Sequence, residues 1–266
     1  MMAMQDTGKF RSNDKDKFYT KPSAALSCVN ELKKHAVGTW IEPSAGGGAF
    51  VDAVKGNVVA MDIEPGRDGI VKQDFLTWEP SHTHCTVFGN PPFGRQSTLA
   101  RKFIKRASTF ADVIGFILPR SFMKPSMQRA FPLEFHLVHE SPVEEDAFLV
   151  NDKPYNVPCV FQIWKRMETP RTVPVEEDTS WIYVKKNEPH DIAIRRVGVY
   201  AGRCMLPGES LSAQSHYFIR LPNNNDVNAI VDHICKHEFP TNTTGPRSLS
   251  KGEINAVLGE CVAVTP

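Results

Sequence analysis

The sequence has no long hydrophobic run, since no apolar stretch approaches the ~18–20 residues that a membrane-spanning helix needs. Its first residues are polar and lack the apolar core of a signal peptide. The six cysteines are scattered without a Cys-x-x-Cys pair, which predicts reduced thiols rather than a disulfide framework. We therefore expect an intracellular, cytoplasmic protein that does not enter a membrane.

Net charge is also almost absent, with 31 Lys+Arg against 30 Asp+Glu and a formal charge of +1. This balance excludes a chain that binds polyanions through a uniformly basic surface. A hydrophobic content of 41% and a charged content of 23% are ordinary for globular proteins and exclude fibrous or wholly disordered chains. A chain of 266 residues can bury a substantial core and predicts one large domain with a smaller addition.

Metal-binding patterns are weak. Two short clusters combine histidine and cysteine, His82-x-His84-Cys85 and His233-x-Cys235-x-His237. Neither has the spacing of zinc ligands or an evident second half. We therefore expect no metal site.

Apolar periodicity predicts strands that alternate with helices over the first two thirds of the chain. Helical spacing covers 21–35, begins again near Ala49, and continues from Leu99 to Phe110 on one face. The expected strands are 37–41, 58–63, 70–71, 85–89, 113–118, 135–139 and 159–164. This alternation predicts an α/β fold with a Rossmann-like, seven-stranded, mostly parallel sheet and helices on both faces. The last two strands lack an intervening helix, so we expect them to form an antiparallel pair that includes the edge strand of the sheet.

The remaining sequence defines the expected domains. Residues 1–15 form a polar leader, 16–167 the α/β domain, and 168–180 a proline-containing linker. Residues 181–266 form a small, strand-rich C-terminal region with helical patterns at 226–237 and 249–258. We expect this region to help bind the substrate.

A glycine-rich loop follows the first predicted strand and precedes a helix, in the segment 42–50 (Glu-Pro-Ser-Ala-Gly-Gly-Gly-Ala-Phe). Glycines let the backbone approach a ligand closely, and the helix start behind them offers free N–H groups. A tight turn that merely needs glycine would give the same pattern. Asp62 ends the next strand about twenty residues later, where a doubly wound fold holds ribose hydroxyls. Asp74 could accept a hydrogen bond from an adenine amino group while Phe75 lies against the ring.

The segment Asn90-Pro91-Pro92-Phe93 comes directly after the predicted strand 85–89. The exocyclic amine of a planar base is a poor nucleophile because its lone pair is delocalised into the ring. The Asn90 side-chain oxygen and the Pro91 carbonyl could bind both amine hydrogens and localise that lone pair toward an electrophilic methyl group. The prolines fix the backbone so that the acceptors converge. Phe93 offers a flat face on which a base can stack.

In the order and spacing of these motifs, residues 16–166 resemble a class I S-adenosylmethionine-dependent amino-methyltransferase of the adenine-N6 group. The segment Asp16-Lys17-Phe18-Tyr19-Thr20 resembles the N-terminal motif of that group, and 115–119 (Gly-Phe-Ile-Leu-Pro) resembles the later strand that walls its active site. The resemblance implies an S-adenosyl-L-methionine site and a catalytic segment at Asn90, Pro91, Pro92 and Phe93. The implied cofactor-binding residues are Phe18, Tyr19, Thr20, Glu42, Pro43, Ala45, Gly46, Asp62, Ile63, Asp74, Phe75 and Asn90. Among these, Glu42 would contact the methionine moiety, Asp62 the ribose, and Asp74 with Phe75 the adenine.

The expected reaction is therefore methyl transfer to N6 of a flipped-out adenine in nucleic acid. We favour DNA as the polymer. The DNA enzymes of the group often end the catalytic motif in tyrosine, whereas position 93 is phenylalanine, so methylation of RNA adenine or of guanine N2 stays open. Two further alternatives are methylation of a protein glutamine and a methyltransferase-like module without catalysis. The sequence does not indicate an oligomeric state.

Charge is distributed unevenly beside this motif. Between Gly94 and Ala130 there are eight basic residues and one acid, Asp112, a net of +7. Segment 131–152 holds six acids and no Lys or Arg, so we do not expect it to contact nucleic acid. A second basic group comprises Lys185, Lys186, Arg195, Arg196 and Arg203. The residues expected to contact phosphates are Arg95, Arg101, Lys102, Lys105, Arg106, Arg120 and Lys124.

Overall fold

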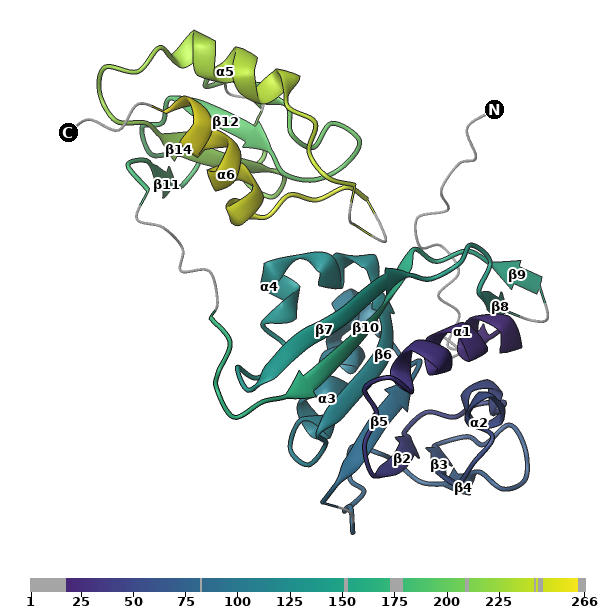
Figure 1. Cartoon of the computed structure of the whole chain (residues 1–266). Coiled ribbons are helices and arrows are strands. Elements are labelled where there is room, and N and C mark those ends of the chain that lie inside the picture. The colour runs from purple at the N-terminus through teal and green to yellow at the C-terminus, as the bar shows by residue number, and fades with distance from the viewer. Residues whose placement is uncertain are drawn as a thin grey trace. The chain divides into compact units, whose positions relative to one another are not determined.

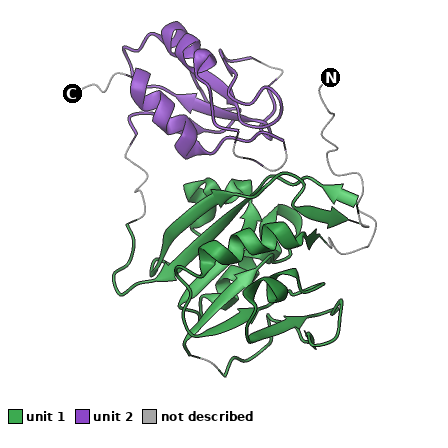
Figure 2. Cartoon of the chain, turned by 45° about the vertical axis from the view of Figure 1, so that its right-hand side comes forward, with its two compact units in different colours: residues 1–173 green, residues 174–266 purple. Residues whose placement is uncertain are grey.

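The computed structural model describes residues 18–81, 83–150, 153–172, 179–208, 211–241, 243 and 246–262. The expected leader 1–15 and two residues of the N-terminal motif, Asp16 and Lys17, lie outside these ranges, as does 173–178 of the expected linker. The chain divides into two compact units, residues 1–173 and 174–266 (Figure 2). No helix within the described ranges is long and apolar enough to cross a membrane.

A seven-stranded sheet forms the centre of the first unit (Figure 1). Its strands are β2 (Thr39–Glu42), β3 (Val58–Asp62), β4 (Val71–Lys72), β5 (Cys85–Gly89), β6 (Val113–Pro119), β7 (Phe135–Pro142) and β10 (Cys159–Arg166). They lie in the order β4-β3-β2-β5-β6-β10-β7. The first five of these are parallel neighbours, and counted along the chain they follow the 3-2-1-4-5 order of doubly wound sheets. The predicted Rossmann-like α/β fold is confirmed.

The predicted antiparallel pair at one edge of the sheet is confirmed as β10 and β7. Strand β10 runs antiparallel to both β6 and β7 and lies between them, so the edge strand is β7. The burial of the two strands gives the reason: six successive residues of β10 are buried, whereas β7 is half exposed along most of its length. A strand that is apolar on both faces is stable only inside a sheet that is covered on both sides.

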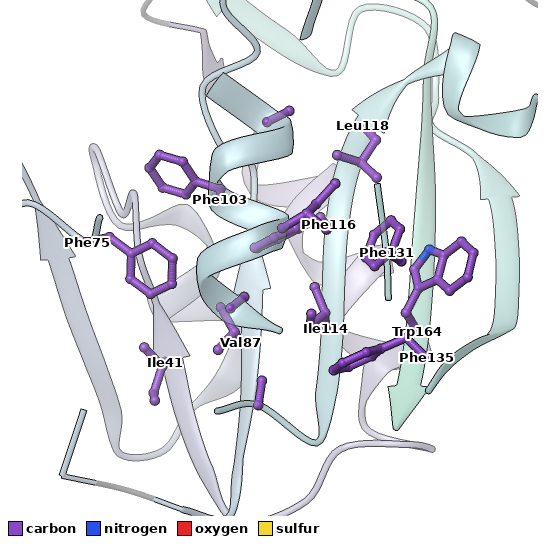
Figure 3. Close-up of a cluster of buried hydrophobic side chains, with 14 of the residues drawn as sticks. Ile41, Phe75, Val87, Phe103, Ile114, Phe116, Leu118, Phe131, Phe135 and Trp164 are labelled. Carbon is purple, nitrogen blue, oxygen red and sulfur yellow. The ribbon is translucent and has the colours of Figure 1, made fainter. Parts of the chain in front are cut away.

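Helices cover both faces of the sheet, as predicted. Figure 1 shows α1 (Pro22–Leu32) in front of the sheet and α3 (Thr98–Ala107) behind it. Side chains of β6 point into both cores. Val113 and Ile117 pack with α1 and α2 (Ala49–Val54), while Phe116 and the residues two positions to either side of it pack with α3. Figure 3 shows the core on the α3 side, with its labelled aromatic and aliphatic side chains between helix and sheet.

Within the first unit, a small three-stranded sheet fixes the start of the described chain. Strands β8 (Phe148–Val150) and β9 (Lys153–Tyr155) form an antiparallel pair, and β1 (Tyr19–Thr20) pairs with β8. Residues 151–152, between these two strands, lie outside the described residues. Pairing with β8 fixes the backbone of residues 19–20 beside the ends of the central strands.

The second unit combines an antiparallel sheet with two helices. Its strands β11 (Ile182–Val184), β12 (Ile192–Arg195), β13 (Cys204–Met205) and β14 (His216–Arg220) lie in the order β11-β14-β12-β13. Helices α5 (Val227–Lys236) and α6 (Lys251–Cys261) share a hydrophobic core with this sheet. Asp226 caps the first of them, and Ser250 with Glu253 forms a capping box on the second.

The cysteines are free thiols at all six positions. Burial is the main cause that raises the pKa of Cys28 to about 12 and that of Cys85 to about 11. The predicted absence of a disulfide framework is confirmed by these free thiols, and the raised pKa values keep the buried ones in the unreactive, protonated form.

Candidate active site at the carboxyl edge of the sheet

A cavity of about 230 Å³ opens where β2 and β5 end. The carboxyl ends of parallel strands meet at one edge of a sheet, which is where doubly wound proteins bind ligands. Side chains and backbone from β1, from the loop after β2, and from the start of α2 line it. The lining residues are Phe18, Tyr19, Thr20, Pro22, Glu42, Ser44, Ala45, Gly46, Gly47, Ala49, Phe50, Asp52 and Asn90. The structure thus brings together seven of the predicted cofactor-binding residues: Phe18, Tyr19, Thr20, Glu42, Ala45, Gly46 and Asn90.

Glu42 is the last residue of β2, and its side chain is only 1% exposed. Its Oε2 atom has no hydrogen-bond partner. Burial raises the pKa of this carboxyl well above its ordinary value, and the negative charge of Asp62 raises it further. Gly89 makes room for the carboxyl, because a Cβ at position 89 would lie 3.2 Å from the Glu42 Cγ. A buried acid with one oxygen left unpaired beside a cavity is suited to bind a cationic or hydrogen-bond-donating ligand group.

Asn90 follows β5 and presents its carboxamide to the same cavity. Its Nδ2 donates to the Thr20 hydroxyl at 3.2 Å and to the Phe18 carbonyl at 3.4 Å. Its Oδ1 is buried and has no partner. The Phe18 carbonyl and the Thr20 hydroxyl therefore accept from the amide nitrogen of Asn90, and its amide oxygen remains available to a ligand.

The glycine loop lies along one side of the cavity. The Asp62 carboxylate accepts from the Gly46 N–H and from the Glu64 N–H, each at 2.8 Å. A Cβ at Gly46 would lie 3.5 Å from the Tyr19 ring, so the loop passes close beneath that ring. Asp62 does not line the cavity, and its visible role is to hold the loop, although each carboxylate oxygen retains a second lone pair.

The remaining predicted cofactor residues lie outside the cavity. Ile63 is exposed, and Pro43 is buried beneath the loop. Asp74 accepts from the Leu76 N–H at 2.9 Å at the next strand end. Phe75 lies in the hydrophobic core against Trp78, Phe103 and Phe110. The expectation that the Phe75 ring stacks on an adenine is therefore wrong, because protein side chains already cover the ring. Only the Phe75 backbone remains able to contact a base.

The rest of the predicted catalytic segment packs as a turn between the two cores. Pro91 is buried, and Pro92 and Phe93 are half-buried. The Phe93 carbonyl accepts from the Leu99 and Ala100 N–H groups at the start of α3, at 3.1 and 3.3 Å. The Phe93 ring contacts the cores on both sides of the sheet. This anchoring fixes the position of Asn90 relative to α3.

The basic residues after the motif divide into two groups. Arg95, Lys102, Lys105 and Arg120 are exposed, as is Arg101, which lies 2.9 Å from the Met127 sulfur. Arg106 bonds to the Trp78 carbonyl and pairs with Glu79. Lys124 is only 6% exposed. The expectation that Arg106 and Lys124 contact phosphates is wrong. Arg106 is already bonded within its own unit, and Lys124 is buried.

Two features of the site were not predicted. Ser44 Oγ donates to the Asn90 carbonyl at 3.2 Å and joins the glycine loop to the catalytic segment. Arg67 makes a bidentate pair with Asp52, both bonds at 2.8 Å, at the start of α2. A serine inside a glycine loop could have suggested the first contact. The second joins a residue of α2 to one in the loop after β3 and leaves no pattern in the sequence.

No protein-family model and no curated protein matches this chain. Solved structures do resemble it. A Pyrococcus horikoshii protein assigned as an RNA methyltransferase aligns with 60% of this chain and 91% of its own at 16% identity and a TM-score of 0.45. The 23S rRNA methyltransferase ErmE aligns with 58% of this chain and 71% of its own at 16% identity and a TM-score of 0.42.

A modification subunit assigned to a type I restriction enzyme of Vibrio vulnificus YJ016 aligns with 66% of this chain and 49% of its own at 12% identity and a TM-score of 0.45. TM-scores below 0.5 fall short of establishing a shared fold. The fold assignment therefore rests on the strand order of this chain, and the chemistry rests on its cavity.

Proposed function

We propose that the chain is an S-adenosylmethionine-dependent methyltransferase that modifies N6 of adenine in nucleic acid. The observation that carries this proposal is the pair of buried acceptors without partners, Glu42 Oε2 and Asn90 Oδ1, beside one cavity. A buried acceptor left without a partner costs about 1–3 kcal/mol, so two beside one cavity favour a cofactor and a substrate that satisfy one each. The motif order from Phe18 to Phe93 supports the same ligand class.

The residues present fit a cofactor of this kind. When bound, the cofactor would supply a methyl group on a positively charged sulfur. Glu42, drawn toward its ionised form by a cationic ligand group, would hold the amino-acid end. The Gly46–Gly47 backbone gives close access beneath Tyr19. Asp62, at the end of the neighbouring strand, is the residue we propose for the ribose hydroxyls, and Asp74 that for the adenine amine.

The catalytic segment would prepare the acceptor amine of the target base. Asn90 Oδ1 accepts one amine hydrogen, and the Pro91 carbonyl accepts the other. Two bonds of this kind turn the nitrogen lone pair out of conjugation with the ring and aim it at the methyl carbon. Thr20 serves this step because its hydroxyl takes the Asn90 Nδ2 and so turns Oδ1 toward the base.

The exposed cations beside the motif support a nucleic-acid substrate. Arg95 and Arg120 flank the carboxyl edge of the sheet, and Lys102 and Lys105 continue along the exposed side of α3. These four cations suit a phosphate backbone, and a target base in a duplex would be flipped out to reach Asn90. We favour DNA, with RNA adenine or guanine N2 as the second candidate because position 93 is phenylalanine.

The decisive experiment compares the wild type with Asn90→Ala and with a matched control, Asn187→Ala, which alters an exposed turn residue. Each protein receives labelled cofactor and separate pools of DNA, RNA and protein, and the products are analysed as nucleosides or amino acids. We expect N6-methyladenine from the wild type and the control and none from Asn90→Ala. Cofactor affinity, measured by calorimetry, should change little in Asn90→Ala. Undiminished methylation by that variant, or labelled glutamine as the product, would refute the proposal.

A further inference from the structure

Among the described residues of the second unit, the loop between β12 and β13 carries the most exposed large apolar side chains. Val199 is 87% exposed and Tyr200 is 62% exposed, in a segment bounded by Gly198 and Gly202. Large exposed side chains of this kind at one loop tip indicate a binding surface rather than a contribution to folding.

Hydrogen bonds hold this loop in a fixed conformation. Across its base, the Arg195 N–H donates to the Arg203 carbonyl and the Gly202 N–H to the Arg195 carbonyl, both at 2.8 Å. At its tip, the Ala201 N–H donates to the Gly198 carbonyl at 3.0 Å, and the Arg203 N–H to the Tyr200 carbonyl at 3.1 Å. A preformed loop presents the Tyr200 ring without an ordering cost on binding.

The neighbouring segment 246–249 fixes the loop from the side. The Gly198 N–H donates to the Arg247 carbonyl at 2.8 Å, and Val197 forms a bridge with Ser248. Residues 239–252 contain Arg247 and Lys251 and no acid. The loop and the segment beside it therefore carry charge of the same sign.

In the sequence, the charged residues nearest to Tyr200 are arginines, and the nearest acids are Asp191 and Glu209. Residues 192–208 include Arg195, Arg196 and Arg203 and no aspartate or glutamate. The Arg195 guanidinium carbon lies 5.9 Å from the centroid of the Tyr200 ring, in a cation–π arrangement. Arg203 is exposed beside the loop. An aromatic ring backed by one arginine and flanked by another suits an unpaired base with its phosphate.

We infer that Tyr200 is a stacking surface for an unpaired base of a nucleic-acid strand, with Arg203 placed for the adjoining phosphate. Bases in a duplex expose only their edges, so the surface selects single-stranded segments. The inference rests on the proposed function for its choice of polymer. It goes beyond that function by assigning strand binding to a particular loop of the second unit.

The test measures fluorescence anisotropy of a dye-labelled single strand of about 16 nucleotides, and of the same strand annealed to its complement, at one fixed salt concentration. The full-length chain is used as wild type, Tyr200→Ala, Tyr200→Trp and Ile182→Ala, the last being a matched control that removes an exposed apolar side chain from β11. Loss of one base stack predicts that Tyr200→Ala weakens single-strand binding roughly tenfold, with a smaller change for the duplex. Tyr200→Trp and Ile182→Ala should bind the single strand like the wild type.

Equal single-strand affinity of Tyr200→Ala and the wild type would overturn the inference, as would an equal loss in Ile182→Ala. Loss of self-association instead of strand binding in Tyr200→Ala, detected by size-exclusion chromatography, would make the loop a protein contact and would also overturn it. The assay needs no cofactor, so it separates the two proposals. Tyr200-dependent binding without any methyl transfer would refute the proposed function alone.

Discussion

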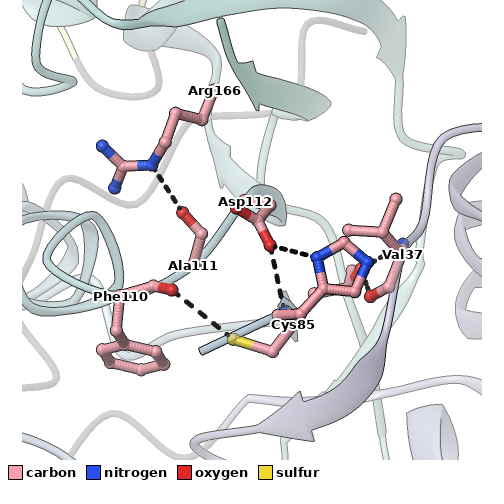
Figure 4. A network of polar contacts seen from close by, with 8 residues as sticks. Val37, Cys85, Phe110, Ala111, Asp112 and Arg166 are labelled. Carbon is pink, nitrogen blue, oxygen red and sulfur yellow. Dashed lines mark hydrogen bonds and ion pairs between the residues drawn. The ribbon is translucent and has the colours of Figure 1, made fainter. Parts of the chain in front are cut away.

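The two ends of the central strands differ in whether their buried polar groups have hydrogen-bond partners. At the amino-terminal end, Asp112 accepts from the Cys85 N–H at 3.3 Å and contacts the His84 ring at 2.9 Å, and Arg166 donates to the Ala111 carbonyl at 3.1 Å (Figure 4). At the carboxyl end, Glu42 and Asn90 each keep a buried oxygen without a partner. Paired groups stabilise the fold, whereas unpaired ones reduce its stability and remain available to a ligand. We therefore expect the amino-terminal edge to contribute mainly to stability and the carboxyl edge to bind the proposed ligands.

The largest expected effect follows from removing the charge of Glu42. In Glu42→Gln we expect affinity for the proposed cofactor to fall about 10- to 150-fold, because a charge-assisted hydrogen bond is replaced by a neutral one. Isothermal calorimetry measures the change, with Glu238→Gln as a control at an exposed acid. An unchanged affinity would show that the cofactor binds elsewhere, and that the unpaired oxygen of Glu42 does not mark a binding edge.

The same variant should be more stable than the wild type, by about 1 kcal/mol at pH 8, because it no longer buries a charge. The Glu42 pKa is raised above its ordinary value of 4.5 in the folded state. This group therefore contributes stability that is fully present below about pH 4.5 and is lost as the pH rises through the folded-state pKa. Urea unfolding at several pH values should show the advantage of Glu42→Gln growing with pH and vanishing near pH 4.5.

At the opposite edge, Asp112→Ala should lower the free energy of unfolding by about 1–3 kcal/mol, because the Cys85 N–H and His84 lose their acceptor. Cofactor affinity should stay within twofold of the wild type, roughly the scatter of distant, independent sites. Urea denaturation and calorimetry measure the two quantities, with Asp68→Ala at an exposed loop position as the control. A loss of affinity as large as that of Glu42→Gln would show that the edges are not separate.

The smallest effect should come from Thr20→Val, which removes the hydroxyl that accepts from Asn90 Nδ2. Freed from that bond, the amide can rotate, and kcat should fall about 2- to 12-fold, the value of one neutral hydrogen bond. The KM for cofactor should change less than kcat. Thr20→Ser should restore kcat, and a valine variant with wild-type kcat would show that Thr20 has no positioning role.

Local pattern was enough to predict most of the fold. The alternation of apolar segments predicted the strands at 58–63, 85–89 and 113–118, and the structure forms them at β3, β5 and β6 within one residue. The position of β10 was not predictable from its missing helix alone. Its continuous burial indicates an interior strand, but only the pairing with β6 and β7 decides where it lies.

The same limit applies to individual side chains near the site. Phe75, Arg106 and Lys124 are the right residue types for stacking and phosphate contact, yet each is buried or already bonded within its own unit. Residue type reports what a side chain can do. Its surroundings, which come from elements distant in the sequence, decide whether it is free to do so.

By itself, the sequence determined the parallel sheet, the glycine loop after its first strand, and the position of the candidate catalytic segment beginning at Asn90, because these follow from periodicity and from short motifs. Tertiary structure alone decided how the side chains of that segment are placed. Thr20 lies 70 residues before Asn90 and turns its amide oxygen toward the cavity. The Gly46 N–H binds Asp62 from 16 residues away, and Glu42 is buried with an oxygen left unpaired. Such contacts depend on which strands become neighbours, and no local pattern encodes that.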